Sequence, residues 1–342
     1  MAIMNKIQQE DIKVFKRNFL FGEEIKGSRF LVTGATGLIG STLVHCLLSL
    51  DENIEIISPV RSLDKARTMY GEEADKINFI ECDLLEYLNG LSVKDNFNYI
   101  IHCASPTVGK YMIEHSIETY MLAIDSTRAI LEYAHKIENC NVVYISSLEY
   151  YGQNFDDKII TEDMQGYVDN TAPRSSYPLG KRAAEFLCAA YARQYGVNVK
   201  VARLTQTIGA GVAGDDTRVF AQFARSVISG TDIILHTKGE SAKPYCYTTD
   251  SISAILYILL KGTRGESYNV ANQETYISIR DLAEFLRDNF NPQIKVVIKE
   301  CSENGYAPVT KLNLSTEKLM RLGWKPQVNL KDMFNRLIKS MQ

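Results

Sequence analysis

Tyr177 and Lys181 are the residues of this chain whose types and spacing point most directly to chemistry. They lie four positions apart in the segment 175–181, Ser-Ser-Tyr-Pro-Leu-Gly-Lys, so on a helix they share one face. A lysine ammonium beside a phenol favours the phenolate, and so lowers a pKa that is about 10 in water. We therefore interpret Tyr177 as a general base with Lys181 as its partner. Many surface helices contain such a pair by chance, so this interpretation depends on two motifs upstream of it.

Ser147, Glu149 and Arg174 are the polar residues that could complete this chemistry. Ser147 follows the apolar run 142–146, and its hydroxyl can hydrogen-bond the substrate oxygen that Tyr177 deprotonates. Glu149 could handle a second proton or hold a substrate group, neither of which a plain alcohol oxidation needs. Arg174 could bind a carboxylate or phosphate bidentately. The plain alternatives are a polar strand end for Ser147, an exposed loop glutamate for Glu149 and a surface arginine at a helix start for Arg174.

A glycine-rich segment upstream has the composition of a phosphate cradle. Gly34, Gly37 and Gly40 follow a short apolar run and open a predicted helix. Glycine permits a tight turn and a close approach of the backbone to a pyrophosphate, and the helix start offers free N–H groups and a positive dipole end. The alternative is an ordinary strand–turn–helix junction. Cofactor contacts are predicted at Gly34, Thr36, Gly37, Leu38, Ile39 and Gly40.

The residues after the second and third predicted strands bear on the choice of cofactor. No acid for a ribose 2′-hydroxyl occurs after the second strand until Asp64, whereas Arg61 is available for a 2′-phosphate. This favours NADP over NAD, unless Arg61 is a solvated surface residue or stacks on the adenine. We place Asp83 and Leu84 at the adenine, where Asp83 could accept from the amino group; the alternative is a turn aspartate.

These residues need a scaffold in which several strands end at one edge of a sheet. Apolar runs predict strands over 28–33, 55–60, 77–82, 99–102, 142–146 and 199–203. Helices are predicted over 38–50, about 114–137, from 177 onward and over 279–290. Strands that alternate with helices indicate an α/β fold with a Rossmann-like, doubly wound parallel sheet, in which ligands bind beyond the carboxyl ends of the strands.

The composition of the chain changes after Leu204, where short loops rich in Gly and Asp begin. We therefore expect three regions. Residues 1–28 form an N-terminal arm, residues 29–204 with about 245–272 form an NAD(P)-binding domain, and about 205–244 with 273–342 form a smaller, interleaved C-terminal substrate-binding lobe.

Composition and charge argue against several other classes of protein. The 342 residues are 45% hydrophobic and 23% charged, which predicts a packed globular core. The net charge of -3 gives no electrostatic case for nucleic acid or an anionic membrane, and no apolar run reaches the length of about 18 that indicates a transmembrane span. The seven cysteines contain no Cys-x-x-Cys pair, and the five histidines show no ligand spacing. We therefore expect reduced thiols, no metal site and a cytoplasmic location.

The two long predicted helices, at about 114–137 and 177–195, have apolar faces wide enough for a partner. Leu122, Ile130 and Leu131 form one stripe, and the run 183–192 forms another. These stripes predict a homodimer through a four-helix bundle. The alternative is that half of these positions face the sheet.

With these residues in hand, the chain from about residue 29 to its end resembles the extended short-chain dehydrogenases/reductases that act on nucleotide sugars, the NAD-dependent epimerase/dehydratase family. The resemblance is carried by 33–40, 102–106, 147–152, Tyr177 with Lys181, 203–209 and 322–326. Within this family the UDP-glucuronate decarboxylases are the most similar, on the segments 104–106, 147–152, 173–185 and 216–219. The resemblance implies cofactor contacts at Cys103, Ala104 and Ser105, and nucleotide-sugar contacts at Ser105, Arg174, Gln206, Arg218 and Lys243.

The chain departs from the decarboxylase pattern at three positions. Ser147 replaces a threonine, and the Arg-x-x-Asn motif ends in Gln206. Lys243 replaces an arginine, so the point charge of an ammonium stands where the family has a guanidinium that can bind a carboxylate bidentately. The second strand resembles that of GDP-mannose 4,6-dehydratase, which uses NADP.

The resemblance implies oxidation of the sugar C4 by bound NAD(P)+, with Tyr177 taking the hydroxyl proton, followed by loss of CO2 from C5. The alternatives are 4,6-dehydration and 4-epimerisation. A remoter one is a non-catalytic NAD(P)-binding regulatory protein, against which the intact set of Ser147, Tyr177 and Lys181 argues.

Overall fold

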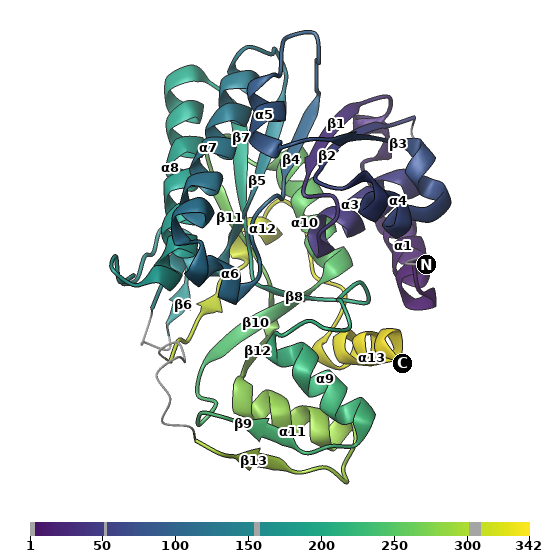
Figure 1. Ribbon diagram of the computed structural model, residues 1–342, viewed down its shortest axis with the longest axis vertical. Helices are drawn as coiled ribbons and strands as arrows, with labels where there is room; N and C mark the ends of the chain where they lie inside the picture. Colours follow the sequence, from purple (N-terminus) through teal and green to yellow (C-terminus); the bar gives the residue numbers. More distant parts are fainter. Residues whose placement is uncertain (1–3, 51–52, 154–157, 301–308) are drawn as a thin grey trace.

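The computed structural model describes residues 4–50, 53–153, 158–300 and 309–342, and its largest element is a seven-stranded parallel sheet (Figure 1). The strand order is β3-β2-β1-β4-β5-β7-β11. Successive strands are added outward from β1 toward β3 on one side and from β4 toward β11 on the other. The boundary between β1 and β4 is therefore the switch point, where doubly wound sheets bind their ligands. The strands are β1 (Arg29–Thr33), β2 (Glu55–Val60), β3 (Ile77–Glu81), β4 (Tyr99–His102), β5 (Asn141–Ser147), β7 (Asn198–Leu204) and β11 (Ser267–Val270).

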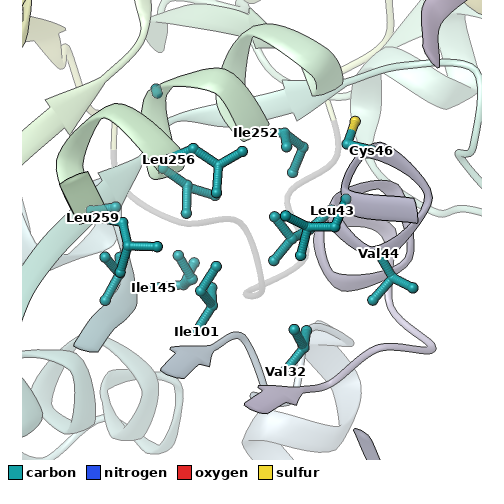
Figure 2. Close-up of a cluster of buried hydrophobic side chains, with 14 of the residues drawn as sticks. Val32, Leu43, Val44, Cys46, Ile101, Ile145, Ile252, Leu256 and Leu259 are labelled. Atoms are coloured by element: carbon teal, nitrogen blue, oxygen red, sulfur yellow. The ribbon is translucent and has the colours of Figure 1, made fainter. Parts of the chain in front are cut away.

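Helices cover both faces of this sheet because neighbouring residues of a strand point to opposite sides. On β1, Phe30 and Val32 pack into the core on one face and Leu31 into the core on the other. The first core is closed by α3 (Leu38–Ser49) and α10 (Thr248–Lys261), whose side chains meet those of β1, β4 and β5 in Figure 2. The second core is closed by α5 (Leu84–Asn89), α7 (Ser116–His135) and α8 (Ser176–Tyr195).

A smaller unit lies beyond the carboxyl ends of the main strands (Figure 1). Its three-stranded sheet has the order β12-β10-β8, with β10 parallel to β8 and antiparallel to β12. Three helices share its hydrophobic core. Its elements are β8 (Gln206–Ile208), α9 (Val219–Ser229), β9 (Ile233–Leu235), β10 (Ala242–Tyr247), β12 (Asn272–Ser278), α11 (Ile279–Phe290), β13 (Val296–Ile298) and α13 (Leu330–Met341). The chain leaves the main sheet after β7 and returns to it for α10 and β11.

The remaining elements are short or peripheral. They are α1 (Lys6–Asn18), α2 (Gly22–Ile25), α4 (Leu63–Tyr70), the 3-10 turns η1 (Gly71–Lys76), η2 (Leu148–Tyr151) and η3 (Pro173–Ser175), α6 (Gly109–Glu114), β6 (Ile159–Ile160), which pairs with β14 (Asn313–Leu314), and α12 (Glu317–Met320).

The N-terminal helix α1 contacts both units, with Phe15 packed into the first core and its polar residues bonded to the smaller unit. Its buried Asp11 accepts hydrogen bonds from the Tyr247 hydroxyl at 2.5 Å and from Arg336 Nη1 at 2.6 Å, and Asn5 Nδ2 donates to the Ala210 carbonyl oxygen at 2.8 Å. Burial raises the pKa of Asp11 to about 6. The arm expected from sequence therefore contains a helix with a buried polar anchor.

The doubly wound α/β fold predicted from the sequence is confirmed, with each of the predicted strands present. The seventh strand, β11, was missed because Ser-Tyr-Asn-Val is short and half polar. The helix predicted over about 114–137 is present as α7. It begins at Ser116 because His115, with a φ of -126° and a ψ of 55°, is not helical and separates it from α6. Within the described residues, no helix is long and apolar enough to cross a bilayer, and no group of three metal-ligating side chains converges.

Candidate active site

The candidate catalytic residues come together at the carboxyl ends of β4 and β5. Ser147 is the last residue of β5, Glu149 lies in η2 directly after it, and Tyr177 and Lys181 lie near the start of α8. Ser147 and Ser105, the latter just after β4, lie close enough to the Tyr177 phenol for their hydroxyls to act on its pKa, which they lower. The Tyr177 phenol and the hydroxyls of Ser147 and Ser105 therefore gather in one place from three separate segments. Such an arrangement suits the deprotonation of a substrate alcohol.

Lys181 is held near the Tyr177 ring by a hydrogen bond to β5, the strand that carries Ser147. Its Nζ donates to the Ile145 carbonyl oxygen at 2.8 Å and lies 4.8 Å from the centre of the Tyr144 ring and 5.4 Å from that of Tyr177. Burial lowers the pKa of Lys181 to about 8. The helical spacing predicted from sequence is thus correct, and the ammonium faces the tyrosine ring.

The lowered pKa predicted for Tyr177 is wrong. The pKa of Tyr177 lies above its ordinary value of 10, because burial of the phenol raises it, and the Glu149 carboxylate raises it further. The hydrogen bond from Ser147 and the charge of Arg174 act in the opposite direction without overcoming burial. A phenol in this setting needs a further positive charge before it can act as a base near neutral pH.

Glu149 and Arg174, predicted as separate substrate contacts, form an ion pair. Arg174 Nη2 lies 2.9 Å from Glu149 Oε1 and 2.8 Å from Oε2, with both side chains about two-fifths exposed. The Arg174 guanidinium also lies 5.6 Å from the centre of the Tyr177 ring. Its Nη1 is buried and has no hydrogen-bond partner, so this donor remains available to an added acceptor.

The smaller unit adds cations to the same side of the site. Lys243, on β10, lies in electrostatic range of Glu149 and Arg218, and burial lowers its pKa. Arg218, at the start of α9, is oriented by Asp216, which accepts from its Nε at 2.9 Å and from its Nη2 at 2.5 Å. Gln206 lies on β8, paired with β10 in register with Tyr245. The structure therefore places Lys243 within electrostatic range of both Glu149 and Arg218.

The glycines of the predicted cradle are required by the packing of the chain itself at two positions. A Cβ on Gly34, whose φ is +73°, would lie 2.8 Å from the Ala104 nitrogen, and one on Gly40 would lie 2.2 Å from the Gly34 oxygen. At Gly37 the nearest atom to an added Cβ, the Gly34 oxygen, is 3.4 Å away, so the packing of the chain does not itself require glycine there. The helix α3 starts after Gly37 without a side-chain cap.

This uncapped helix start fits a phosphate. The N–H groups of Leu38, Ile39 and Gly40 occupy the first turn of α3, where they have no acceptor within the helix. Backbone donors at such a terminus, together with the helix dipole, suit a pyrophosphate. Thr36 lies in the turn before it.

The other predicted cofactor contacts surround the same edge of the sheet. Arg61 is exposed directly after β2. Asp83 caps α5, accepting from the backbone N–H groups of Leu85 at 2.9 Å and Glu86 at 3.0 Å, and Leu84 is the first residue of that helix. These hydrogen bonds give Asp83 a structural role as the N-terminal cap of α5, in line with the turn aspartate considered as the alternative. The contact of Asp83 with adenine stays a prediction.

Cys103 and Ala104 follow β4, where Ala104 lies against Gly34. Burial raises the pKa of Cys103 to about 12, so this thiol is no nucleophile at neutral pH. His102, just before it, is a packed strand residue. Its Nδ1 lies 2.7 Å from Thr33 Oγ1 and its Nε2 lies 2.9 Å from Ser126 Oγ, and burial lowers its pKa to about 3.

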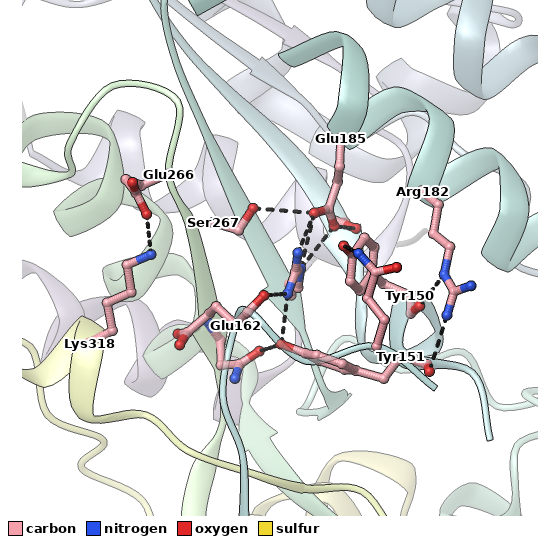
Figure 3. A network of polar contacts seen from close by, with 12 residues as sticks. Tyr150, Tyr151, Glu162, Arg182, Glu185, Glu266, Ser267 and Lys318 are labelled. Atoms are coloured by element: carbon pink, nitrogen blue, oxygen red, sulfur yellow. Dashed lines mark hydrogen bonds and ion pairs between the residues drawn. The ribbon is translucent and has the colours of Figure 1, made fainter. Parts of the chain in front are cut away.

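A buried polar network that the sequence analysis did not identify holds η2 and the end of β5 (Figure 3). Arg203 on β7 pairs with Glu185 on α8, with Nη2 2.8 Å from Oε2. Glu185 Oε1 also accepts from Ser146 Oγ at 2.5 Å, and Arg203 Nη1 donates to the Tyr151 hydroxyl at 2.9 Å. Glu185 and Arg203 both lie in segments that carry the family resemblance, 173–185 and 203–209, but nothing in those segments indicates that they pair.

Arg182 completes the support of this turn from the helix that carries Tyr177. Its Nε donates to the Tyr150 carbonyl oxygen at 2.7 Å, and its Nη2 donates to those of Tyr151 at 3.2 Å and Gly166 at 2.8 Å. The helix α8 therefore both presents the candidate base and fixes the turn that carries Glu149.

Comparison with known proteins gives the same family for most of the chain. The model of the NAD dependent epimerase/dehydratase family matches residues 30–271. Among curated proteins, UDP-glucuronic acid decarboxylase 5 of Arabidopsis thaliana is 28% identical over 310 residues, covering 89% of this chain and 86% of the relative. UDP-glucuronic acid decarboxylase 1 of Xenopus tropicalis is 25% identical, covering 96% and 77%.

Solved structures share the fold at lower identity. UDP-glucuronic acid 4-epimerase from Bacillus cereus, in complex with UDP-glucuronic acid and NAD, superposes with a TM-score of 0.75 at 20% identity, covering 92% of this chain and 98% of the other. dTDP-glucose 4,6-dehydratase from Bacillus anthracis, in complex with NAD, gives a TM-score of 0.75 at 21% identity, covering 92% and 96%.

Proposed function

Because the chain belongs to the NAD dependent epimerase/dehydratase family, we propose that it oxidises the C4 of a nucleotide sugar with bound NAD(P)+ and then decarboxylates it at C5. The curated relatives named as UDP-glucuronic acid decarboxylases support this reaction and suggest UDP-glucuronate as the substrate. The observation that carries the proposal is that Glu149, paired with Arg174, lies in electrostatic range of both Tyr177 and Lys243. A carboxylate on the sugar would lie near two cations, Arg174 and Lys243, beside the candidate base Tyr177.

In this mechanism the chain's own residues handle the proton and the charges. Tyr177 takes the proton of the C4 hydroxyl, and Ser147 hydrogen-bonds the same oxygen. The chemistry supplied by bound NAD(P)+ is reversible hydride acceptance from C4, together with a positive charge that lowers the pKa of Tyr177. The product of oxidation is a β-keto acid, so the bond between C5 and the carboxyl carbon breaks with its electrons passing to the C4–C5 enolate. C5 then takes up a proton. Return of the hydride to C4, with Tyr177 giving its proton back to the oxygen, would restore the C4 hydroxyl and leave a product lighter by one CO2.

Two other outcomes start from the same 4-ketone. Loss of water from C5 and C6 would give a 4-keto-6-deoxy sugar, and reduction on the other face would give the 4-epimer. Of these two, dehydration is favoured by Glu149, which could deliver a proton to the leaving C6 hydroxyl. We prefer decarboxylation because Lys243 adds a cation on the Glu149 side of the site.

Mass spectrometry of products from a panel of nucleotide sugars tests the proposal. We expect UDP-glucuronate to be converted into a product lighter by one CO2, with the C4-oxidised state formed on the way. A product lighter by one water, or one of unchanged mass, would replace decarboxylation by dehydration or epimerisation. Cofactor bound without any hydride transfer would support a regulatory protein instead.

We further propose the division of the chain and its location suggested by the sequence. The NAD(P)-binding domain comprises 29–204 with about 245–272, and the nucleotide-sugar lobe comprises about 205–244 and 273–342. The described cysteines are free thiols, which supports the cytoplasm as the compartment.

The cofactor is proposed to be NADP in preference to NAD, because Arg61 is exposed directly after β2 and can reach a 2′-phosphate. Arg61→Ala is expected to lose a charge-assisted contact of about 1.5–3 kcal/mol with NADP and little with NAD. Calorimetry with both cofactors measures this. Arg67→Ala, which removes an equally exposed arginine from α4, is the control. Tighter binding of NAD than of NADP by the unaltered protein would overturn the proposal.

A homodimer through α7 and α8 is proposed on only part of the two stripes chosen in the sequence. Ile130 and Leu131 are buried against the sheet and are unavailable to a partner. The exposed apolar side chains are instead Ile117 on α7, 74% exposed, and Phe186 on α8, 66% exposed. These two positions support a helical interface on the face of α7 and α8 that points away from the sheet.

Light scattering at micromolar concentration is expected to give a dimer for the unaltered chain and a monomer for Phe186→Glu. Burial of one phenylalanine side chain is worth about 1.5–3 kcal/mol, and the symmetric interface contains two copies. Leu20→Glu, which alters an equally exposed apolar residue at 73% exposure, should leave the dimer intact. A monomeric unaltered protein would contradict the proposal.

A further inference from the structure

We propose that Tyr70 is a positioning residue for cofactor binding, because its hydroxyl fixes the peptide that joins Ala35 to Thr36 in the glycine-rich turn. The Tyr70 hydroxyl donates to the Ala35 carbonyl oxygen at 2.8 Å. The two residues are 35 positions apart in the chain, on α4 and on the turn after β1. This inference rests on the proposed binding of NAD(P).

The position of Tyr70 leaves its hydroxyl little freedom. The residue is 4% exposed, and its ring centre lies 4.7 Å from that of His45 and 5.3 Å from that of Phe79. The ring is thus clamped between α3 and β3, with the hydroxyl aimed at the turn. Burial raises the pKa of Tyr70 well above 10, so the hydroxyl stays a donor at any physiological pH.

The Ala35 carbonyl depends on this donor. Ala35 is fully buried, and a buried carbonyl group left without a hydrogen-bond partner is destabilising. The neighbouring Gly34 carbonyl already accepts from the Gly37 N–H at 3.0 Å. Tyr70 therefore supplies the hydrogen bond that keeps the Ala35 carbonyl directed into the protein.

The consequence for the cofactor follows from the planarity of the peptide. The Ala35–Thr36 bond is trans, so its N–H points away from its carbonyl group and hence away from Tyr70. On this proposal the Thr36 N–H, in the turn before α3, joins the N–H groups of the first turn of that helix as a donor to the pyrophosphate. If the peptide rotated, a carbonyl oxygen would replace an N–H beside the pyrophosphate, and the two negative groups would repel.

The helix α4 thus links two parts of the proposed cofactor site. It begins just after Arg61, the candidate partner of a 2′-phosphate, and ends at Tyr70 under the pyrophosphate turn. Its start is capped by Ser62 Oγ, which accepts from the Lys65 N–H at 3.2 Å. Loss of the Tyr70 hydroxyl should affect the turn and leave this start unchanged.

Tyr70→Phe tests the inference because it removes one oxygen atom and keeps the ring packing. Calorimetry with NAD and NADP alone is expected to show dissociation constants weaker by on the order of 10-fold for both. Without cofactor, hydrogen exchange should be faster in the segment 34–41. Tyr99→Phe is the matched control, since the Tyr99 hydroxyl donates to the Glu24 carbonyl oxygen at 3.1 Å, away from the turn.

The outcomes separate this inference from the proposed function. If the unaltered protein binds neither cofactor, the proposed function fails. If it binds them and Tyr70→Phe binds them equally well, with unchanged exchange in 34–41, only the role of Tyr70 is wrong. A loss of affinity matched by Tyr99→Phe would also overturn it, because the effect would then be one of general stability.

Discussion

Tyr177→Phe is expected to lower turnover of the true substrate by on the order of 10²–10⁴-fold while leaving cofactor binding nearly unchanged. The phenylalanine ring keeps the packing beside Lys181 and Arg174, and the substitution removes only the hydroxyl that faces Ser147 and Ser105. Without it, no group at that point can take the C4 hydroxyl proton. Initial rates at saturating substrate, with calorimetry of the cofactor, measure both quantities.

Tyr191→Phe is the control for this experiment. It removes a phenol from the same helix, where the hydroxyl bonds to Glu132 away from the site. We expect its turnover to stay close to that of the unaltered protein. Retention of more than about a tenth of the activity by Tyr177→Phe would exclude this tyrosine as the general base.

Glu149→Gln is expected to stop the reaction after C4 oxidation. The amide cannot form the ion pair with Arg174, so the carboxylate that lies near both Tyr177 and Lys243 is lost. Oxidation at C4 needs only Tyr177, Ser147 and the cofactor. We therefore expect substrate to reduce the bound nicotinamide, seen by its absorbance, while the final product fails to form.

Glu284→Gln provides a matched control for Glu149→Gln. Glu284 is 38% exposed, as is Glu149, and pairs with Arg280 at 3.2 Å on α11. This variant should form product at the rate of the unaltered protein. Normal product formation by Glu149→Gln would make Glu149 an ordinary loop carboxylate and would favour simple 4-epimerisation.

The sequence predicted the elements and motifs well because each is a local pattern. The apolar runs defined the strands that carry Ser147 and the glycine turn, and the spacing of Tyr177 and Lys181 placed both on one side of α8. The strand β11 escaped notice because four residues, half of them polar, do not form an apolar run.

The interactions between distant residues were the part that the sequence did not predict. The pairing of Glu149 with Arg174 depends on how η2 and η3 face each other. The pKa of Tyr177 rises because burial outweighs a nearby charge, and burial cannot be read from spacing. Helical periodicity also did not show that Ile130 faces the sheet and Phe186 does not.

The most direct test of the central claim uses UDP-glucuronate isotopically labelled at its carboxyl carbon. Decarboxylation after C4 oxidation predicts that the label leaves as CO2 and that the remaining nucleotide sugar carries none. Tyr177→Phe should release no label above background. Label retained in a product that has lost water, or in one of unchanged mass, would contradict the account and identify the protein as a dehydratase or an epimerase.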